Sequence, residues 1–145
     1  MSVPSNLVFI DTNILVYAHD AAEGSRHHAA VAVLQDLWLN GTGVLSTQVL
    51  QEFYSVATRT MKPAMPKREA RERVAEYSEW CTMDTNPQLI VSASILDESH
   101  NLHWWDAMIL EAAMRSGATT LLSADMRHGQ RFGRLTVRNP FVETN

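Results

Sequence analysis

Leu7-Val8-Phe9-Ile10 is a short, unbroken apolar run that ends abruptly at Asp11, and Thr12-Asn13-Ile14-Leu15-Val16-Tyr17 follows it. An apolar run of this length is typical of a strand that is buried on both faces, as in a parallel sheet. Ligands of open α/β sheets bind beyond the carboxyl ends of the strands. Asp11 is therefore the first candidate for a functional residue, although aspartate is also a good N-cap for a helix.

Four other short segments have the character of this first strand, and helical patterns fill most of the chain between them. The predicted strands are residues 44–46, 80–83, 119–122 and 135–137. Apolar side chains recur at the three- and four-residue spacing of an amphipathic helix over residues 29–38, 49–57, 89–96 and 104–115. Asn86-Pro87 is typical of an N-cap and first turn, and Gly117 of a helix end.

Strands that alternate with helices predict an α/β fold. We expect a central, mainly parallel sheet of four to five strands, with helices on both faces. The chain has 145 residues, which is a common size for one domain, and shows no internal repeat or linker. We therefore expect a single domain over residues 1–145.

The composition restricts the class of protein. Hydrophobic residues make up 46% of the chain, yet no apolar run approaches the roughly 20 residues of a membrane span. Cys81 is the only cysteine, so an intrachain disulfide is excluded and a reducing compartment is favoured. The sequence predicts a cytoplasmic protein without a membrane partner. Its net charge of -4 argues against a general nucleic-acid coat protein.

Three more acids occupy positions that favour a role at the same edge of the sheet. Asp125 closely follows the strand predicted over residues 119–122, and parallel strands bring it near Asp11. Asp106 falls on the core-facing side of its helix, where an ionised carboxylate is costly unless it is paired, metal-bound or held by the helix N-terminus. Glu52 lies on the shoulder of an apolar helix face, so an ordinary solvated glutamate is an equal alternative for it.

A cluster of four carboxylates is unstable without cations, because the charges repel one another. Ligand sets made only of oxygen select hard ions, so Mg²⁺ is the expected cofactor, with Mn²⁺ as a substitute. One or two such ions promote phosphodiester hydrolysis and reverse the local negative charge that would otherwise repel a nucleic acid. The acids therefore indicate a metal-dependent nuclease.

Four motifs in this order resemble the PIN-domain family, and more narrowly its VapC-type toxins. They are Phe9-Ile10-Asp11-Thr12-Asn13, Gln51-Glu52-Phe53, Trp105-Asp106-Ala107 and Leu122-Ser123-Ala124-Asp125, which span nearly the whole chain. The resemblance implies a parallel-sheet nuclease fold, with Asp11, Glu52, Asp106 and Asp125 as catalytic, metal-binding acids. It also implies that Thr12, Asn13 and Ser123 support that site.

The resemblance further implies an endoribonuclease that cleaves structured RNA, forms a homodimer and is inhibited by a cognate antitoxin protein. Residues 126–142 contain no acid, and a basic segment there offers possible RNA contacts. Its members are Arg127, His128, Arg131 and Arg134. Trp104 and Trp105 can stack on bases, but the usual burial of tryptophan favours the core or a dimer interface.

Other functions remain open at this point. An aspartyl-phosphate enzyme is disfavoured, because position 13, where such enzymes usually carry a second acid, is asparagine. A stand-alone RNA-processing nuclease would need the same four acids without an antitoxin. A module that binds RNA or protein without cutting would not need the acids at all.

Overall fold

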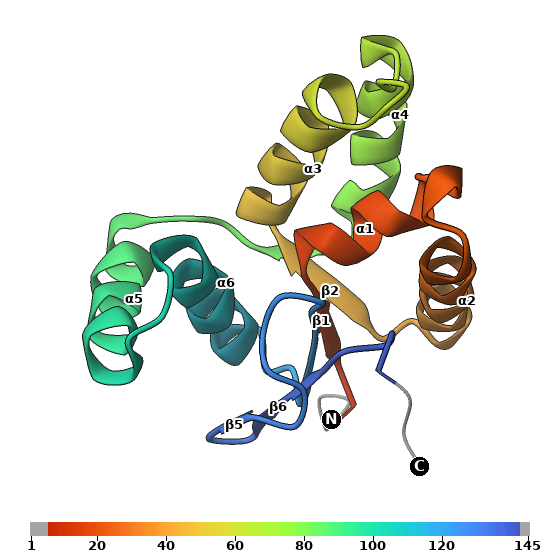
Figure 1. Cartoon of the computed structure of the whole chain (residues 1–145). Coiled ribbons are helices and arrows are strands. Elements are labelled where there is room, and N and C mark those ends of the chain that lie inside the picture. Colours follow the sequence, from red (N-terminus) through yellow and green to blue (C-terminus); the bar gives the residue numbers. More distant parts are fainter. Residues whose placement is uncertain (1–5, 143–145) are drawn as a thin grey trace.

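A six-stranded sheet forms the centre of the computed structural model, which describes residues 6–142 (Figure 1). The strands are β1 (Val8–Ile10), β2 (Gly43–Ser46), β3 (Cys81–Met83), β4 (Thr120–Leu122), β5 (Arg131–Phe132) and β6 (Leu135–Arg138). Their order across the sheet is β3-β2-β1-β4-β6-β5. All neighbours are parallel except β5 and β6, so the predicted α/β fold with a mainly parallel sheet is confirmed.

Five of these strands coincide with the predicted segments, and β5 is the additional one. It has two residues and pairs antiparallel with β6 in a hairpin, with Phe132 opposite Leu135. A strand this short carries no readable alternation of apolar and polar residues. At the predicted third strand, Trp80 ends a short 3-10 helix, η2 (Ser78–Trp80), and β3 begins only at the next residue.

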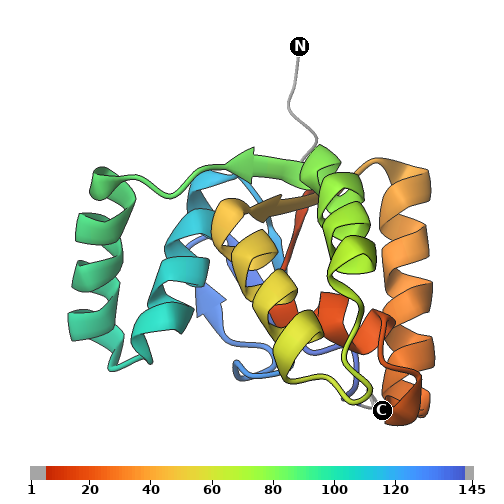
Figure 2. The same cartoon turned by 90° about the horizontal axis from the view of Figure 1, so that it is seen from above.

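Helices flank the sheet on both sides (Figures 1 and 2). Figure 1 shows α5 and α6 on one side of β1 and β2, with α1 and α2 on the other. The chain's α-helices are α1 (Thr12–Ala18), α2 (Ser25–Asn40), α3 (Thr47–Arg59), α4 (Lys67–Tyr77), α5 (Pro87–His100) and α6 (Trp104–Arg115), with the 3-10 helix η1 (Ala21–Glu23) after α1. The pairs α5–α6, α1–α2, α1–α3 and α3–α4 pack together.

Local sequence signals explain several helix ends. Asn86 caps α5, because its side-chain oxygen accepts a hydrogen bond from the backbone N–H of Leu89 at 2.9 Å. The predicted bounds of α6 agree with the structure. α4 carries no readable apolar pattern and was not predicted, since only Ala70 and Tyr77 of this strongly charged helix are buried.

The strand order creates a crevice beside β1. The chain proceeds from β1 to β2 and β3 on one side, and then returns to place β4 on the other. Such a reversal leaves a ligand-binding crevice at the carboxyl ends of the two central strands. The Asp11 N–H donates to the Leu122 carbonyl oxygen at 3.0 Å, so the ends of β1 and β4 meet at this crevice.

Within residues 6–142, no helix has both the length and the apolar character needed to cross a bilayer. The single domain expected over residues 1–145 stays a prediction. Its first five and last three residues lie outside the part of the chain that the structure describes.

Candidate active site

Asp11 lies at the base of the crevice, directly after β1, with 5% of its surface exposed. It is also the N-cap residue of α1, and its Oδ1 accepts a hydrogen bond from the Thr12 N–H at 2.7 Å. Its second oxygen, Oδ2, accepts from the Ser123 hydroxyl at 2.8 Å. The capping role and the functional role weighed for Asp11 are therefore compatible, because one side chain can fill both.

Ser123 and Asn13 fix the loop after β4 against α1. Ser123 is fully buried, and its Oγ accepts hydrogen bonds from the backbone N–H groups of Asp125 and Met126 at 3.2 and 3.3 Å. The Asn13 Oδ1 accepts from the Ala124 N–H at 3.1 Å. These contacts fix the position of the loop that carries Asp125. Ser123 and Asn13, two of the three predicted supporting residues, therefore contact the segment that carries a predicted acid.

Glu52 approaches the same region from α3. Its Oε1 accepts a hydrogen bond from the Thr12 hydroxyl at 2.9 Å and from the Gln48 Nε2 at 3.4 Å. Gln48 is buried and also donates to the Trp105 carbonyl oxygen at 3.3 Å, which ties α3 to the start of α6. Gln48 was not among the predicted site residues, although its position one helical turn before Glu52 was a usable signal.

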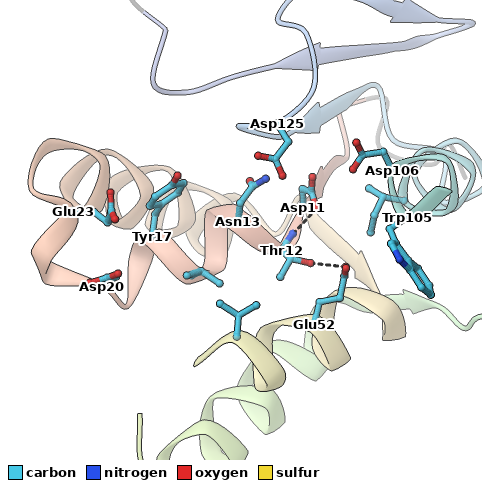
Figure 3. A pocket seen from close by; sticks show the side chains of 13 residues that line it. Asp11, Thr12, Asn13, Tyr17, Asp20, Glu23, Glu52, Trp105, Asp106 and Asp125 are labelled. Atoms are coloured by element: carbon cyan, nitrogen blue, oxygen red, sulfur yellow. Dashed lines mark hydrogen bonds between the residues drawn. The ribbon is translucent and has the colours of Figure 1, made fainter. Parts of the chain in front are cut away.

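Asp106 and Asp125 complete the set. Asp106 is half-buried in the first turn of α6, and Asp125 is exposed on the loop after β4. Figure 3 shows both carboxylates facing the space above Asp11, while Glu52 enters from the opposite side next to Thr12. The four predicted acids therefore come from four different parts of the chain.

All four acids line one pocket of about 310 Å³. Two further acids that the sequence analysis missed, Asp20 and Glu23, lie on the wall that α1 and η1 form (Figure 3). No lysine or arginine is among the lining residues that the structure describes. The pocket is thus strongly negative. Its remaining lining residues are Thr12, Asn13, Val16, Tyr17, Val56, Trp105 and Ile109.

Burial and mutual repulsion make Asp11, Glu52 and Asp106 weaker acids than usual, because they raise the pKa of each group. Burial raises the pKa of Asp11 to about 7; the Ser123 and Thr12 hydrogen bonds oppose this rise, and the charges of Asp106 and Asp125 add to it. The pKa of Asp106 is raised chiefly by burial and then by Asp125. Burial is also the main reason why the pKa of Glu52 is raised. Each group therefore gains from a nearby cation or proton.

The donor chemistry of this pocket fits Mg²⁺ better than a softer ion. Every candidate ligand is a carboxylate oxygen, and Mg²⁺ is typically held by one or two carboxylates while it keeps several waters. Among the described residues, no three acidic, histidine or cysteine side chains stand close enough to form a ready-made metal cage. A structural zinc site requires four direct ligands, whereas Mg²⁺ keeps several of its waters.

Comparison with known families identifies the architecture. The sequence matches the PIN domain family over residues 8–133, a range that contains all four acids of the pocket. This chain belongs to the PIN domain family. A comparison with curated proteins finds no match.

Solved structures with the same PIN domain fold are distant in sequence. VapBC2 of Rickettsia felis, bound to a DNA fragment from its promoter, matches with 19% identity and a TM-score of 0.63, over 92% of this chain and 98% of that one. A toxin–antitoxin complex of Klebsiella pneumoniae matches with 18% identity, a TM-score of 0.64 and the same coverage. VapC20 of Mycobacterium tuberculosis, a toxin that cleaves the sarcin–ricin loop, matches with 18% identity and a TM-score of 0.60, over 81% of this chain and 91% of that one.

The predicted RNA-binding residues of this PIN domain lie apart from the acidic pocket. Arg127, His128, Arg131 and Arg134 are exposed, and none of them lines it. His128 instead borders a separate hollow, and its Nδ1 accepts a hydrogen bond from the Asn139 N–H at 3.0 Å. The structure therefore does not bring this basic segment into the site, and its contact with RNA stays a prediction.

Replacing Ser123 with alanine is expected to weaken this site through Asp11. The variant removes the hydroxyl that binds Asp11 and leaves two N–H groups without their acceptor. Loss of such a supporting contact costs roughly 10- to 100-fold in metal affinity or activity. Isothermal titration with Mn²⁺, together with cleavage rates, measures this loss.

Ser94→Ala is the matched control, because the exposed Ser94 bonds only to the Val91 carbonyl oxygen of its own helix among the described residues. We expect this control to bind Mn²⁺ like the unaltered chain. Equal Mn²⁺ affinity in the Ser123→Ala and Ser94→Ala variants would show that Ser123 does not support the site.

Proposed function

We propose that this PIN domain is a magnesium-dependent endoribonuclease that hydrolyses RNA phosphodiester bonds, and that it is the toxin of a toxin–antitoxin pair. The observation that carries the proposal is the pocket at the carboxyl ends of β1 and β4. Six carboxylates line it without a compensating lysine or arginine among the described lining residues. Such a concentration of negative charge is costly in a folded protein unless cations bind there.

Each acid has a distinct position from which it can act. Asp11 is held from two sides at the base of the pocket, whereas Asp106 and Asp125 approach from α6 and the β4 loop. Glu52, oriented by Thr12 and Gln48, faces them. When bound, Mg²⁺ or Mn²⁺ supplies charge neutralisation at the scissile phosphate and activation of the attacking water. A carboxylate whose pKa is raised and that does not contact the cation is a stronger base than usual, and it can accept a proton from the attacking water.

The choice of RNA rests on the motif resemblance and on the fold shared with VapC20. RNA is a polyanion, so it can enter an acidic pocket only after bound cations have reversed the negative charge of that pocket. Arg127, His128, Arg131 and Arg134 would then contact the phosphate backbone further away, as expected for residues that position RNA without contributing to the chemistry. A protein that acts on RNA in this way belongs in the cytoplasm.

A cognate antitoxin is the proposed protein partner, since the structures from Rickettsia felis and Klebsiella pneumoniae are toxin–antitoxin complexes. A second copy of the chain is the other proposed partner. Ile90, Val91 and Ile95 form an exposed apolar patch on α5, as expected of a surface that another protein covers. Sedimentation equilibrium of the purified protein tests the homodimer, and a mass of one chain at micromolar concentration would exclude it.

Cleavage of total RNA with and without Mg²⁺ tests the enzymatic proposal. We expect new RNA ends only when Mg²⁺ or Mn²⁺ is present, and chelation should abolish them. Mapping these ends identifies the substrate. RNA that stays intact with both ions would favour the alternative of a binding module without catalysis.

Growth of bacteria that express the chain separates a toxin from a stand-alone RNA-processing nuclease. A toxin arrests growth, and co-expression of the protein encoded next to its gene restores it. Cleavage in vitro without growth arrest would favour the processing enzyme.

A further inference from the structure

Trp105 is an exposed aromatic side chain directly beside a proposed catalytic acid. It precedes Asp106 in the first turn of α6, and 62% of its surface is exposed. Its neighbour Trp104 is partly buried and packs against the core. For both tryptophans the sequence favoured either the core or a dimer interface, and the dimer interface stays a prediction. For Trp105 a core position is wrong, because the first turn of α6 directs the two side chains differently.

The indole of Trp105 borders two adjoining hollows. One is the acidic pocket, and the other is a hollow of about 240 Å³ on the α3 side of the indole. One face of α3 provides the rest of the second hollow, since the residues involved are spaced by three and four positions. These residues are Gln48, Gln51, Glu52 and Ser55. Glu52 lines both hollows, so a ligand in the second one lies next to the proposed site of hydrolysis.

A hydrogen-bonded connection fixes this arrangement. Gln48 Nε2 donates both to the Trp105 carbonyl oxygen at 3.3 Å and to Glu52 Oε1 at 3.4 Å. The backbone that carries the indole is thereby tied to a proposed catalytic acid. Figure 3 shows the carboxylate of Asp106 turned toward Asp125, whereas the indole of Trp105 extends away from them. Two consecutive residues thus direct one side chain toward Asp125 and the other toward the second hollow, which both Trp105 and Glu52 line.

We propose that Trp105 stacks on an unpaired nucleobase next to the scissile phosphate, and that the polar face of α3 selects that base. This inference rests on the proposed ribonuclease function. An aromatic face binds any base by stacking, while side chains that donate and accept hydrogen bonds discriminate between base edges. Gln51 and Ser55 are exposed and carry such groups. A base in a duplex is already stacked, so the arrangement selects RNA loops and single strands.

A nucleobase fits this position better than a second protein chain. The hollow shares Glu52 and Trp105 with the acidic pocket, and every other residue that lines it is polar. Surfaces covered by proteins have apolar centres with few charges. The exposed apolar patch of α5 (Ile90, Val91 and Ile95) has that character, whereas Trp105 stands among glutamines, a glutamate and a serine.

Two variants of Trp105 test the proposal, with Leu39→Ala as the control for loss of an exposed apolar side chain. Leu39 lies on α2, is 84% exposed and lines neither hollow. Loss of one stacking contact weakens binding of single-stranded RNA by roughly 5- to 100-fold. We expect that loss for Trp105→Ala, seen as a raised KM with a smaller change in kcat and a relaxed base preference beside the cut. A base stacked on an indole quenches its fluorescence, so we expect RNA to quench the unaltered chain. Trp105→Phe should keep most of the affinity and lose the part of this quenching that comes from Trp105, which is one of four tryptophans.

The outcomes separate this inference from the function on which it rests. If the unaltered chain releases no fragments in Mg²⁺, the proposed function and the stacking role both fail. If the unaltered chain cleaves RNA, and Trp105→Ala cleaves it with the same KM and base preference as Leu39→Ala, only the stacking role is overturned. A Trp105→Ala variant that changes from dimer to monomer and retains the original KM would also overturn it, because the indole would then be a protein contact.

Discussion

Replacement of Asp11 by asparagine is expected to lower the rate of RNA cleavage by about 1,000-fold or more, because several kcal/mol of metal-dependent charge stabilisation is lost. An amide has nearly the shape of a carboxylate and can still accept the hydrogen bond from the Thr12 N–H. It does not carry the negative charge that binds a cation. The change therefore removes the proposed chemistry and keeps the fold, and single-turnover cleavage with circular dichroism measures both effects.

Asp84→Asn is a matched control for this variant, since it makes the same chemical change at an exposed position outside the pocket. We expect the control to cleave RNA at the original rate. Asp106→Asn should behave like Asp11→Asn, because both carboxylates face the same space. If either pocket variant kept more than a tenth of the original rate with its fold intact, that residue would not be a catalytic acid.

The second large effect is a pH-dependent stability that originates at Asp11. Its pKa is about 7 in the folded chain, and the usual value is 3.8. Between these values the folded state binds more protons than the unfolded state, so the metal-free protein becomes less stable as pH rises. The raised pKa corresponds to about 4 kcal/mol of stability that is present below pH 4 and lost by pH 7. The raised pKa values of Glu52 and Asp106 act in the same direction.

Mg²⁺ competes with the proton for these carboxylates. We expect the ion to raise the melting temperature at pH 8, where Asp11 is ionised, and to have little effect at pH 5. His19 opposes the trend, because burial lowers its pKa and so makes the folded state less stable in acid. The difference between the unaltered chain and Asp11→Asn cancels the His19 contribution. Equal pH profiles for these two proteins from pH 5 to pH 8 would contradict the assigned role of Asp11 burial.

Five of the six strands and three of the four acids were predictable because each carries a local signal, whereas β5 is too short to carry one and Glu52 rested mainly on the motif resemblance. β1 is a continuous apolar run, and Asp11 interrupts it at the point where α1 begins. Asp106 stands on an apolar helix face, where a charge requires an explanation. The parallel sheet then determines that acids distant in sequence meet at one edge. These features can be recognised in the sequence without knowledge of tertiary contacts. The fold class and the convergence of the acids could therefore be predicted from them.

Other parts of the site depend on tertiary contacts that a single sequence does not reveal. Gln48 is an ordinary helix residue until α6 places the Trp105 carbonyl oxygen within reach of its amide. Asp20 and Glu23 join the pocket only because η1 turns the chain back beside α1. The exposure of Trp105 likewise depends on how α6 sits against α3. Long-range packing, and not residue type, decides each of these roles.

X-ray diffraction from crystals soaked in Mn²⁺ tests the central claim most directly, because Mn²⁺ scatters anomalously and replaces Mg²⁺ at oxygen sites. We predict an anomalous peak in the pocket, about 2 Å from a carboxylate oxygen of Asp11, Asp106 or Asp125, as the coordination of such small hard ions requires. The same soak of an Asp11→Asn crystal should lose or weaken that peak. A pocket without any peak at saturating Mn²⁺, or ions found only on acids outside it, would contradict a metal-dependent nuclease.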